Sequence, residues 1–250
     1  MTEGQAWIVP DWPAPSRVHA AVSTRLGPGV STGLYGRLNL GARAGDAPEA
    51  VRANRLAVQQ ALGLPRAPHW LQQVHGVEVF DADGGRSGGE PVADASVTRH
   101  AGEPLAVLTA DCLPVLFCTM DGSGVAAAHA GWRGLAGGVL EAAVRSLPAA
   151  AGQVMAWLGP CIGKASYEVG EEVRDAFVSS DTEAAGFFAA TRPGHWLCDL
   201  AGLARHRLLA AGVGSVHGGG FDTRTDDRFY SYRRDGAQSG RFASLVWLTS

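Results

Sequence analysis

One cysteine and two histidines in this 250-residue chain have the chemistry of metal ligands. They are His75, Cys112 and His129, and they lie too far apart in the sequence for a compact zinc finger. Imidazole and thiolate bind zinc well, and three protein ligands beside one open position are typical of a catalytic zinc site. The spacing leaves a second interpretation open, in which Cys112 packs in the core and the histidines are ordinary polar residues near turns.

Each of the three residues lies in a polar stretch that interrupts the apolar pattern of the chain. The stretches are residues 70–76, 109–114 and 128–134. Each lies at the edge of an expected β-strand, and reactive groups on loops held by rigid strands are a common arrangement in active sites. The sequence therefore indicates a site that the fold assembles from several loops.

The apolar periodicity predicts a mixture of strands and helices. Alternating and continuous apolar runs predict strands at residues 18–23, 77–80, 105–108, 114–119, 124–129, 154–158, 215–217 and 242–248. Apolar residues three and four positions apart predict helices at residues 49–62, 135–147, 169–178 and 200–211, the last between Asp199 as N-cap and Gly212. Because several strands follow one another without a helix between them, the pattern is α/β of the α+β type, and an alternating Rossmann fold does not fit.

The composition is that of one folded domain. Hydrophobic residues make up 46% and charged residues 18% of the chain, which is enough apolar content for a core and excludes general disorder. The glycine-rich residues 81–90 indicate a surface loop, but core-like sequence follows at once. We therefore expect a single domain over residues 1–250.

Charge and cysteine content point to a cytoplasmic protein. A net charge of −3 gives no basic footprint for nucleic acid or for a membrane surface. No apolar run reaches the ~18 residues of a membrane span, and residues 1–5 do not begin a signal peptide. The four cysteines, Cys112, Cys118, Cys161 and Cys198, are then expected to be reduced. Protein partners do not follow from the sequence.

Nine short stretches carry a resemblance to a known family. They are residues 23–25, 38–41, 45–46, 70–76, 109–115, 129–134, 157–160, 167–170 and 229–235. Together they resemble the YfiH family, also called laccase-domain or polyphenol-oxidase proteins and, more recently, purine nucleoside phosphorylases. The resemblance covers nearly the whole chain and implies a four-layer α/β/β/α sandwich with two mixed sheets. It also implies that His75, Cys112 and His129 bind zinc.

The resemblance implies phosphorolysis of adenosine, inosine, guanosine and methylthioadenosine, together with adenosine deamination. A zinc ion with three protein ligands lowers the pKa of bound water to ~7, and hydroxide attack on C6 of adenine is the chemistry of zinc deaminases. The usual deaminase signature, His-x-Glu followed by Pro-Cys-x-x-Cys, is missing from this sequence. Some members of the family are also linked to editing of peptidoglycan precursors.

Phosphorolysis requires phosphate beside a nucleoside, and an arginine can donate two hydrogen bonds to phosphate. Arg133 is the best candidate because it follows His129 closely and lies near the start of a predicted helix, whose N-terminus also favours anions. Arg43 is the second candidate for phosphate. An ion pair between Arg133 and Asp111 is the alternative, structural interpretation.

Four further side chains have both a functional and a structural interpretation. Asp111, next to Cys112, could orient a ligand histidine or carry a proton, and we count it among the catalytic candidates. Asn39 and Gln73 could contact ribose or base, or could simply hold loops in place. Trp132 could stack on a purine or pack in the core.

Three other functions compete with the zinc enzyme. In the first, Cys112 is the nucleophile and His129 its base in a metal-free hydrolase or amidase, as in a toxin deamidase whose fold the family resembles. In the second, copper replaces zinc in a polyphenol oxidase, although eight scattered histidines cannot build the trinuclear cluster of a laccase. In the third, the chain is a binding factor without catalytic activity.

Overall fold

This computed structural model describes residues 6–85 and 88–250. The expectation for residues 1–5 and the middle of the predicted loop at residues 81–90 therefore lie outside the described residues. Within the described ranges, no helix has both the length and the apolar character needed to cross a membrane.

The first sheet has four strands in the order β1-β2-β13-β5. Their bounds are Trp7–Ile8 for β1, Val18–Ser23 for β2, Phe242–Leu248 for β13 and Leu105–Thr109 for β5. The three strand pairs are antiparallel, and an isolated parallel bridge joins His69 to Leu105 at the edge. The last strand of the chain thus lies in the middle of this sheet.

The second sheet has six strands in the order β12-β8-β6-β7-β4-β3. Their bounds are Ser215–Gly218 for β12, Val154–Leu158 for β8, Leu113–Thr119 for β6, Val125–Ala130 for β7, Ala95–Thr98 for β4 and Val79–Asp81 for β3. The pairs at the two edges are parallel and the inner pairs antiparallel, so this sheet is mixed.

The two large sheets pack face to face. Successive side chains of a strand point to opposite faces of its sheet, so the apolar side chains on one face of each sheet can pack against the other sheet. On β6, Leu116 and Cys118 point into the core between the sheets, where they meet Phe242 and Val246 of β13. The adjacent side chains of β6 point the other way, toward the helices. Both faces of the six-stranded sheet are therefore buried.

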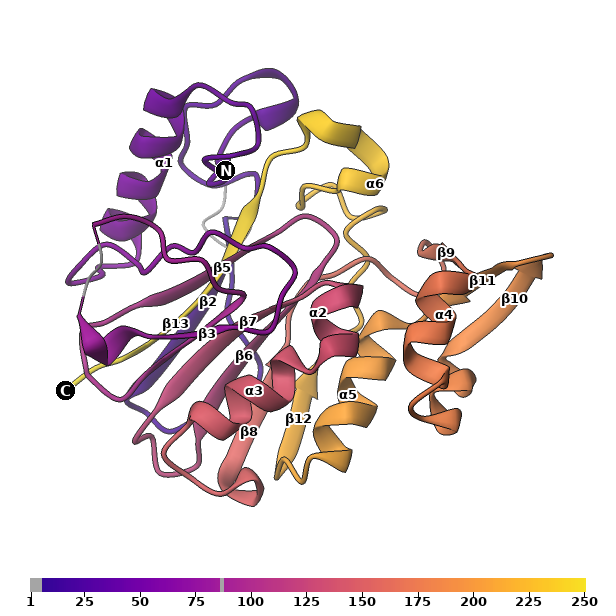
Figure 1. Cartoon of the computed structure of the whole chain (residues 1–250). Helices are drawn as coiled ribbons and strands as arrows, with labels where there is room; N and C mark the ends of the chain where they lie inside the picture. Colours follow the sequence, from indigo (N-terminus) through magenta and orange to yellow (C-terminus); the bar gives the residue numbers. More distant parts are fainter. Residues whose placement is uncertain (1–5, 86–87) are drawn as a thin grey trace.

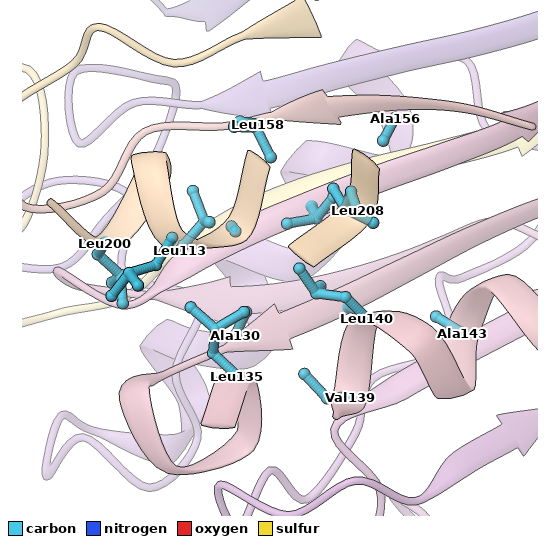
Figure 2. Close-up of a cluster of buried hydrophobic side chains, with 14 of the residues drawn as sticks. Leu113, Ala130, Leu135, Val139, Leu140, Ala143, Ala156, Leu158, Leu200 and Leu208 are labelled. Atoms are coloured by element: carbon cyan, nitrogen blue, oxygen red, sulfur yellow. The ribbon is translucent and has the colours of Figure 1, made fainter. Parts of the chain in front are cut away.

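Helices cover the outer faces of both sheets and complete a four-layer sandwich (Figure 1). Helix α1 (Pro48–Ala61) places Val58 against Ala243 and Leu245 of the four-stranded sheet. On the other side, α2, α3 and α5 cover the six-stranded sheet, and Figure 2 shows Leu200 of α5 beside Leu113 and Leu135 of α2 beside Ala130. Their bounds are Trp132–Gly137 for α2, Val139–Ser146 for α3 and Leu200–Ala210 for α5. The predicted fold class is confirmed.

A smaller sheet with its own helix projects from one end of the sandwich (Figure 1). Its strand order is β10-β11-β9, and all pairs are antiparallel. The bounds are Phe188–Arg192 for β10, His195–Cys198 for β11, Glu168–Gly170 for β9 and Glu171–Val178 for the accompanying helix α4. Helix α6 (Tyr232–Asp235) lies near the start of β13, and short 3-10 helices lie at Gly33–Tyr35, Ala82–Gly84, Ala151–Gln153, Thr182–Phe187 and Gly236–Gln238.

The structure departs from the predicted elements in three ways. The helix expected at residues 135–147 is two helices, because Gly138 has a φ of +98° and interrupts the helical backbone between α2 and α3. The helix expected from residue 169 begins at Glu171, and β9 occupies the preceding residues. Strands β1, β4, β10 and β11 were not expected. In the four-stranded sheet the named strand pairs are antiparallel, and the parallel pairing is the His69–Leu105 bridge at its edge.

Candidate functional site

The fold brings His75, Cys112 and His129 together. One ligand atom from each residue can be chosen so that all three lie within 4.8 Å of one another. Sγ of Cys112 lies 3.8 Å from Nε2 of His75, and the two imidazole rings meet edge to face with centroids 4.8 Å apart. His129 lies on β7, Cys112 immediately precedes β6, and His75 lies on the loop before β3. Three separate strand ends thus supply one donor set.

A buried carboxylate, Asp94, connects the two histidines. Its Oδ1 accepts hydrogen bonds from Nδ1 of His129 at 2.8 Å and from the backbone N–H of His75 at 2.9 Å. Its Oδ2 accepts from the N–H groups of Gly76 at 2.7 Å and Val74 at 3.1 Å. An ionised carboxylate only accepts hydrogen bonds, so Nδ1 of His129 carries a proton, and Nε2 is the nitrogen that can give up its proton and bind a metal.

Gly131 leaves the space that this donor set needs. A Cβ at this position would lie 2.7 Å from Cδ2 of His75 and 3.1 Å from Sγ of Cys112. Two imidazole nitrogens and a thiolate suit zinc, and they also suit copper. The residues present therefore fit a single metal ion with an open position.

Electrostatics favour the thiolate form of Cys112. Burial by itself would raise the pKa of the thiol, but the charge of His129 and hydrogen bonds from His129 and His75 lower it to about 6. Burial likewise opposes charging of His129, yet Cys112 and Asp94 raise the pKa of His129 to about 9. The thiolate is the form of cysteine that binds metals.

The other three cysteines differ from Cys112 in the direction in which their surroundings shift the thiol pKa. All four are free of disulfides, and Cys118, Cys161 and Cys198 are buried. Burial raises the pKa of Cys118 and of Cys198 to about 12, and it also raises the pKa of Cys161. At neutral pH, Cys112 is the cysteine of the four that ionises.

The donor set opens into a cleft of about 570 Å³. Five arginines line it, namely Arg43, Arg55, Arg133, Arg233 and Arg241. The carboxylates among its described lining residues are Glu90 and Asp111, so cationic side chains outnumber anionic ones. A cleft with this excess of positive charge is suited to an anionic ligand.

Arg133 is exposed and lines the cleft, as a phosphate-binding residue must. Its guanidinium carbon lies 4.3 Å from the centre of the Trp132 ring, on which it stacks. The alternative ion pair with Asp111 is not formed, because the two oxygens of Asp111 bind the hydroxyl of Thr223 and the backbone N–H of Arg233, both at 2.6 Å. The phosphate-binding role of Arg133 remains a prediction.

Arg43 and Gln73 also line the cleft, but their polar groups already have partners. Arg43 forms an ion pair with Glu90, which also pairs with Arg55. The amide of Gln73 donates to the carbonyl of Leu108 and accepts from its N–H, each at 2.8 Å. Gln73 therefore holds its loop against the end of β5, which is the structural interpretation of this residue.

Asn39 is not among the residues that line the cleft, and its predicted contact with ribose or base stays a prediction. The side chain is buried, and its Oδ1 accepts from the N–H groups of Gly41 at 3.0 Å and Arg241 at 2.8 Å. Its Nδ2 donates to Asp46. Because Gly41 and Arg241 both line the cleft, Asn39 shapes the site from behind.

Asp94, and not Asp111, is the carboxylate that accepts a hydrogen bond from His129 in the described structure, so a role of Asp111 toward the candidate ligands stays a prediction. Asp111 has a φ of +92°, a left-handed conformation that is rare for a residue with a side chain, and it directly precedes Cys112. Its carbonyl accepts from the N–H of Ile162, and its carboxylate holds Thr223 and Arg233. Its catalytic role stays a prediction.

The sequence reasoning missed Asp94, Arg233, Arg241 and the tyrosines Tyr167 and Tyr232 of the cleft. Arg233 and Tyr232 lie within residues 229–235, one of the stretches that carry the family resemblance, so that stretch could have indicated them. Asp94 precedes β4 within a largely apolar segment, and a buried acid there is the signal that was available.

Comparison with known proteins finds similarity over a range that includes the three candidate ligands. The family model described as multi-copper polyphenol oxidoreductase laccase matches residues 19–249. A purine nucleoside phosphorylase of Pseudomonas aeruginosa is 54% identical over 97% of this chain and 98% of its own length. The purine nucleoside phosphorylase YfiH of Escherichia coli is 48% identical over 96% of this chain and 98% of its own length.

Solved structures agree with this match. A crystal structure of a Neisseria meningitidis protein has a TM-score of 0.94 and 50% identity, covering 98% of this chain and all of that chain. The structure of YlmD from Geobacillus stearothermophilus has a TM-score of 0.89 at 28% identity, covering all of this chain and 98% of that chain. The chain belongs to the laccase-like YfiH family, whose curated relatives here are named purine nucleoside phosphorylases.

Proposed function

We propose that the chain is a zinc-dependent purine nucleoside phosphorylase that accepts adenosine, inosine, guanosine and methylthioadenosine. The observation that carries the proposal is the opening of the His75–Cys112–His129 donor set into a cleft lined by five arginines. A metal site beside an anion site matches the two needs of phosphorolysis, which are a bound phosphate and a stabilised leaving base. The names of the relatives support the same activity.

His75, Cys112 and His129 would hold the metal. Zinc bound there would supply a positive charge that polarises an oxygen of phosphate or water at its open position. We propose zinc as the resident metal and copper as the alternative, because thiolate and imidazole in a reducing compartment favour zinc. A donor set for one metal ion supports this choice over multicopper oxidase chemistry.

The reaction transfers the ribosyl group from base to phosphate. A phosphate oxygen forms a bond to C1′ of the ribose, the C1′–N9 bond breaks, and the base leaves with the electron pair and takes up a proton. The products are a free purine and a sugar 1-phosphate, which is ribose 1-phosphate for adenosine, inosine and guanosine and its 5-methylthio analogue for methylthioadenosine. The cation-like sugar forms and the phosphate dianion is consumed within the cleft. Fixed charges act more strongly there than in water.

The residues of the chain would orient the phosphate. Arg133, Arg233 and Arg241 offer donors on the cleft wall, and Arg43 lies beside Glu90 on the same cleft. We propose that Asp111 serves by holding Arg233 through its backbone N–H, and that Trp132 stacks on the purine. Gln73 and Asn39 would act through the loops that they hold.

A chromatographic assay tests the proposal. Zinc-loaded protein is incubated with inosine or adenosine, with and without phosphate. We expect hypoxanthine or adenine to be released only with phosphate, and we expect His75→Ala, Cys112→Ala and His129→Ala to abolish release. His195→Ala, a histidine of the small sheet, is the matched control and should keep full activity. Zinc-loaded protein that releases no base from any nucleoside would refute the proposal.

Adenosine deamination would use the same site. A water oxygen adds to C6 of adenine, the C6–N bond breaks, and ammonia leaves with the proton that it needs. Formation of inosine from adenosine in the absence of phosphate, lost together with the metal ligands, is the expected result. Release of adenine without any inosine would limit the chain to phosphorolysis.

The ionised Cys112 beside His129 favours a second candidate, a metal-free cysteine hydrolase or amidase that acts on peptidoglycan precursors. Zinc dependence distinguishes the two. Removal of zinc should end phosphorolysis, whereas a cysteine nucleophile would work without metal and leave an acyl-enzyme detectable by mass spectrometry.

We propose that the chain works in the cytoplasm on nucleoside and phosphate, without nucleic-acid or membrane partners. Four free cysteines, one of them a thiolate, are suited to a reducing compartment.

A further inference from the structure

The carboxylate of Asp94 connects the two candidate histidine ligands. It accepts hydrogen bonds from the side chain of His129 and from the backbone of the loop that carries His75. Its side chain is fully buried, and its two oxygens accept four hydrogen bonds. Three of the donors are consecutive backbone N–H groups, and the fourth is Nδ1 of His129. We infer that Asp94 is a positioning residue that sets the tautomer of His129 and the backbone of the His75 loop together; the inference rests on the proposed metal centre.

The first half of the inference concerns His129. A neutral imidazole carries one proton, and only the nitrogen without the proton can bind a metal. Because the ionised Asp94 accepts at 2.8 Å, it holds the proton on Nδ1. The lone pair of Nε2 is then available on the side of the ring that faces Cys112. Partners of this kind on metal-binding histidines typically contribute about 10- to 100-fold to metal affinity.

The second half concerns the loop. His75 has a φ of +62°, a left-handed conformation that costs free energy for any residue with a side chain. The loop turns so that the N–H groups of Val74, His75 and Gly76 converge on one carboxylate. A carboxylate satisfies three converging donors, whereas a neutral amide has only one accepting oxygen. The loop conformation that points His75 at Cys112 therefore depends on a negative charge at position 94.

The substitution Asp94→Asn separates this role from simple packing, since it keeps the shape of the side chain. Whichever way the amide turns, its NH₂ group faces hydrogen-bond donors. If it faces His129, it favours the opposite tautomer, with the proton on Nε2, and removes the metal-binding lone pair. If it faces Val74 and Gly76, it leaves those N–H groups unpaired and releases the loop.

Two measurements without nucleoside test the inference, so that its failure is distinct from failure of the proposed function. The first is the zinc dissociation constant from competition with a chelator, which we expect Asp94→Asn to raise about 10- to 100-fold. The second is amide hydrogen exchange of residues 74–76 in zinc-free protein, which we expect to be slow in the wild type and at least tenfold faster in the variant.

Asp222→Asn is the matched control. Asp222 also accepts from two backbone N–H groups, those of Gly163 and Arg224, and from the hydroxyl of Ser166, but it contacts neither histidine. It should lower stability without changing the zinc dissociation constant. An unchanged zinc affinity in folded Asp94→Asn protein would overturn the inference.

The wild-type protein gives an independent test if Asp94→Asn does not fold. Nitrogen-15 spectra of the zinc-loaded wild type should show His129 with its proton on Nδ1 and the metal on Nε2. A proton on Nε2, or fast exchange of the amides of residues 74–76 in the zinc-free wild type, would also overturn the inference.

Discussion

Gly131 faces the ring of His75 so closely that a Cβ on Gly131 would lie 2.7 Å from Cδ2 of that ring. The same Cβ would lie 3.1 Å from Sγ of Cys112. Gly131 has φ −65° and ψ 160°, which any residue adopts without strain. The absence of a side chain at this position is therefore required by the neighbouring ligands and not by the backbone.

Gly131→Ala should accordingly impair metal binding more than folding. We expect the added methyl group to displace His75 and to raise the zinc dissociation constant at least tenfold. Circular dichroism should show an unchanged fold. Gly186→Ala is the control, because a Cβ at Gly186 would meet nothing within 4 Å. Equal zinc affinity in the two variants would contradict the interpretation that the neighbouring ligands require a glycine at position 131.

Cys112 should be the most reactive cysteine of the zinc-free protein. Its pKa of about 6 means that the thiolate fraction rises as the pH increases through 6 and is nearly complete at pH 7.5. The rate of alkylation by iodoacetamide should follow that curve, and zinc should protect the thiol. Peptide mapping by mass spectrometry checks both points. A rate that rises only around pH 8.5, or equal labelling of buried Cys118, would contradict the expectation.

Arg133→Ala should raise the KM for phosphate at least tenfold in the phosphorolysis assay, because the exposed guanidinium faces the cleft and forms no ion pair with Asp111. Stability should change by no more than about 0.5 kcal/mol, as for other exposed side chains. Arg145→Ala, at an exposed position of α3, is the control and should leave the KM unchanged. A KM for phosphate that Arg133→Ala does not change would remove Arg133 from the phosphate site.

Asn39→Ala should destabilise the protein and also weaken phosphate binding. The substitution leaves the buried N–H group of Gly41 and the half-buried N–H group of Arg241 without their acceptor, and the loss of stability should be about 2–6 kcal/mol at about 1–3 kcal/mol per unpaired group. Urea unfolding measures the loss. Zinc affinity should stay within twofold, since Asn39 touches no metal ligand; a large change in it would mean that the loop and the metal site are coupled.

The three candidate ligands were predicted through the family resemblance, to which their local pattern added a weak signal, and most of the large sheets were predicted from strong local apolar patterns. His75, Cys112 and His129 interrupt apolar runs at strand ends, and β6, β7 and β13 are long and apolar. Strands β10 and β11 carry mostly exposed or half-buried side chains, so they lack the apolar pattern on which the prediction depended. Gly138 lies within the helix expected at residues 135–147, and its positive φ, which the sequence does not show, breaks that helix.

The roles of polar side chains were harder to predict than their positions. An asparagine that contacts a ligand and one that holds two loops have the same chemistry, and only the tertiary contacts of Asn39 with Arg241, far away in the sequence, distinguish them. The same holds for Asp111, which the sequence offered as a carboxylate that orients a ligand histidine, whereas Asp94 is the carboxylate that contacts His129. Such assignments depend on which segments meet in space, and local patterns carry no information about that.

The three candidate ligands come from loops that are close only in the folded chain, and this couples metal occupancy to global stability. A metal that binds the native chain but not the unfolded chain shifts the folding equilibrium by mass action, by about 2.7 kcal/mol when free metal is at 100 times its dissociation constant. The entropic cost of gathering His75, Cys112 and His129 is met during folding, before any ion arrives. With the proposed zinc site, the cleft would exchange its metal without refolding, and the thermal midpoint of the protein would report the free zinc concentration around it.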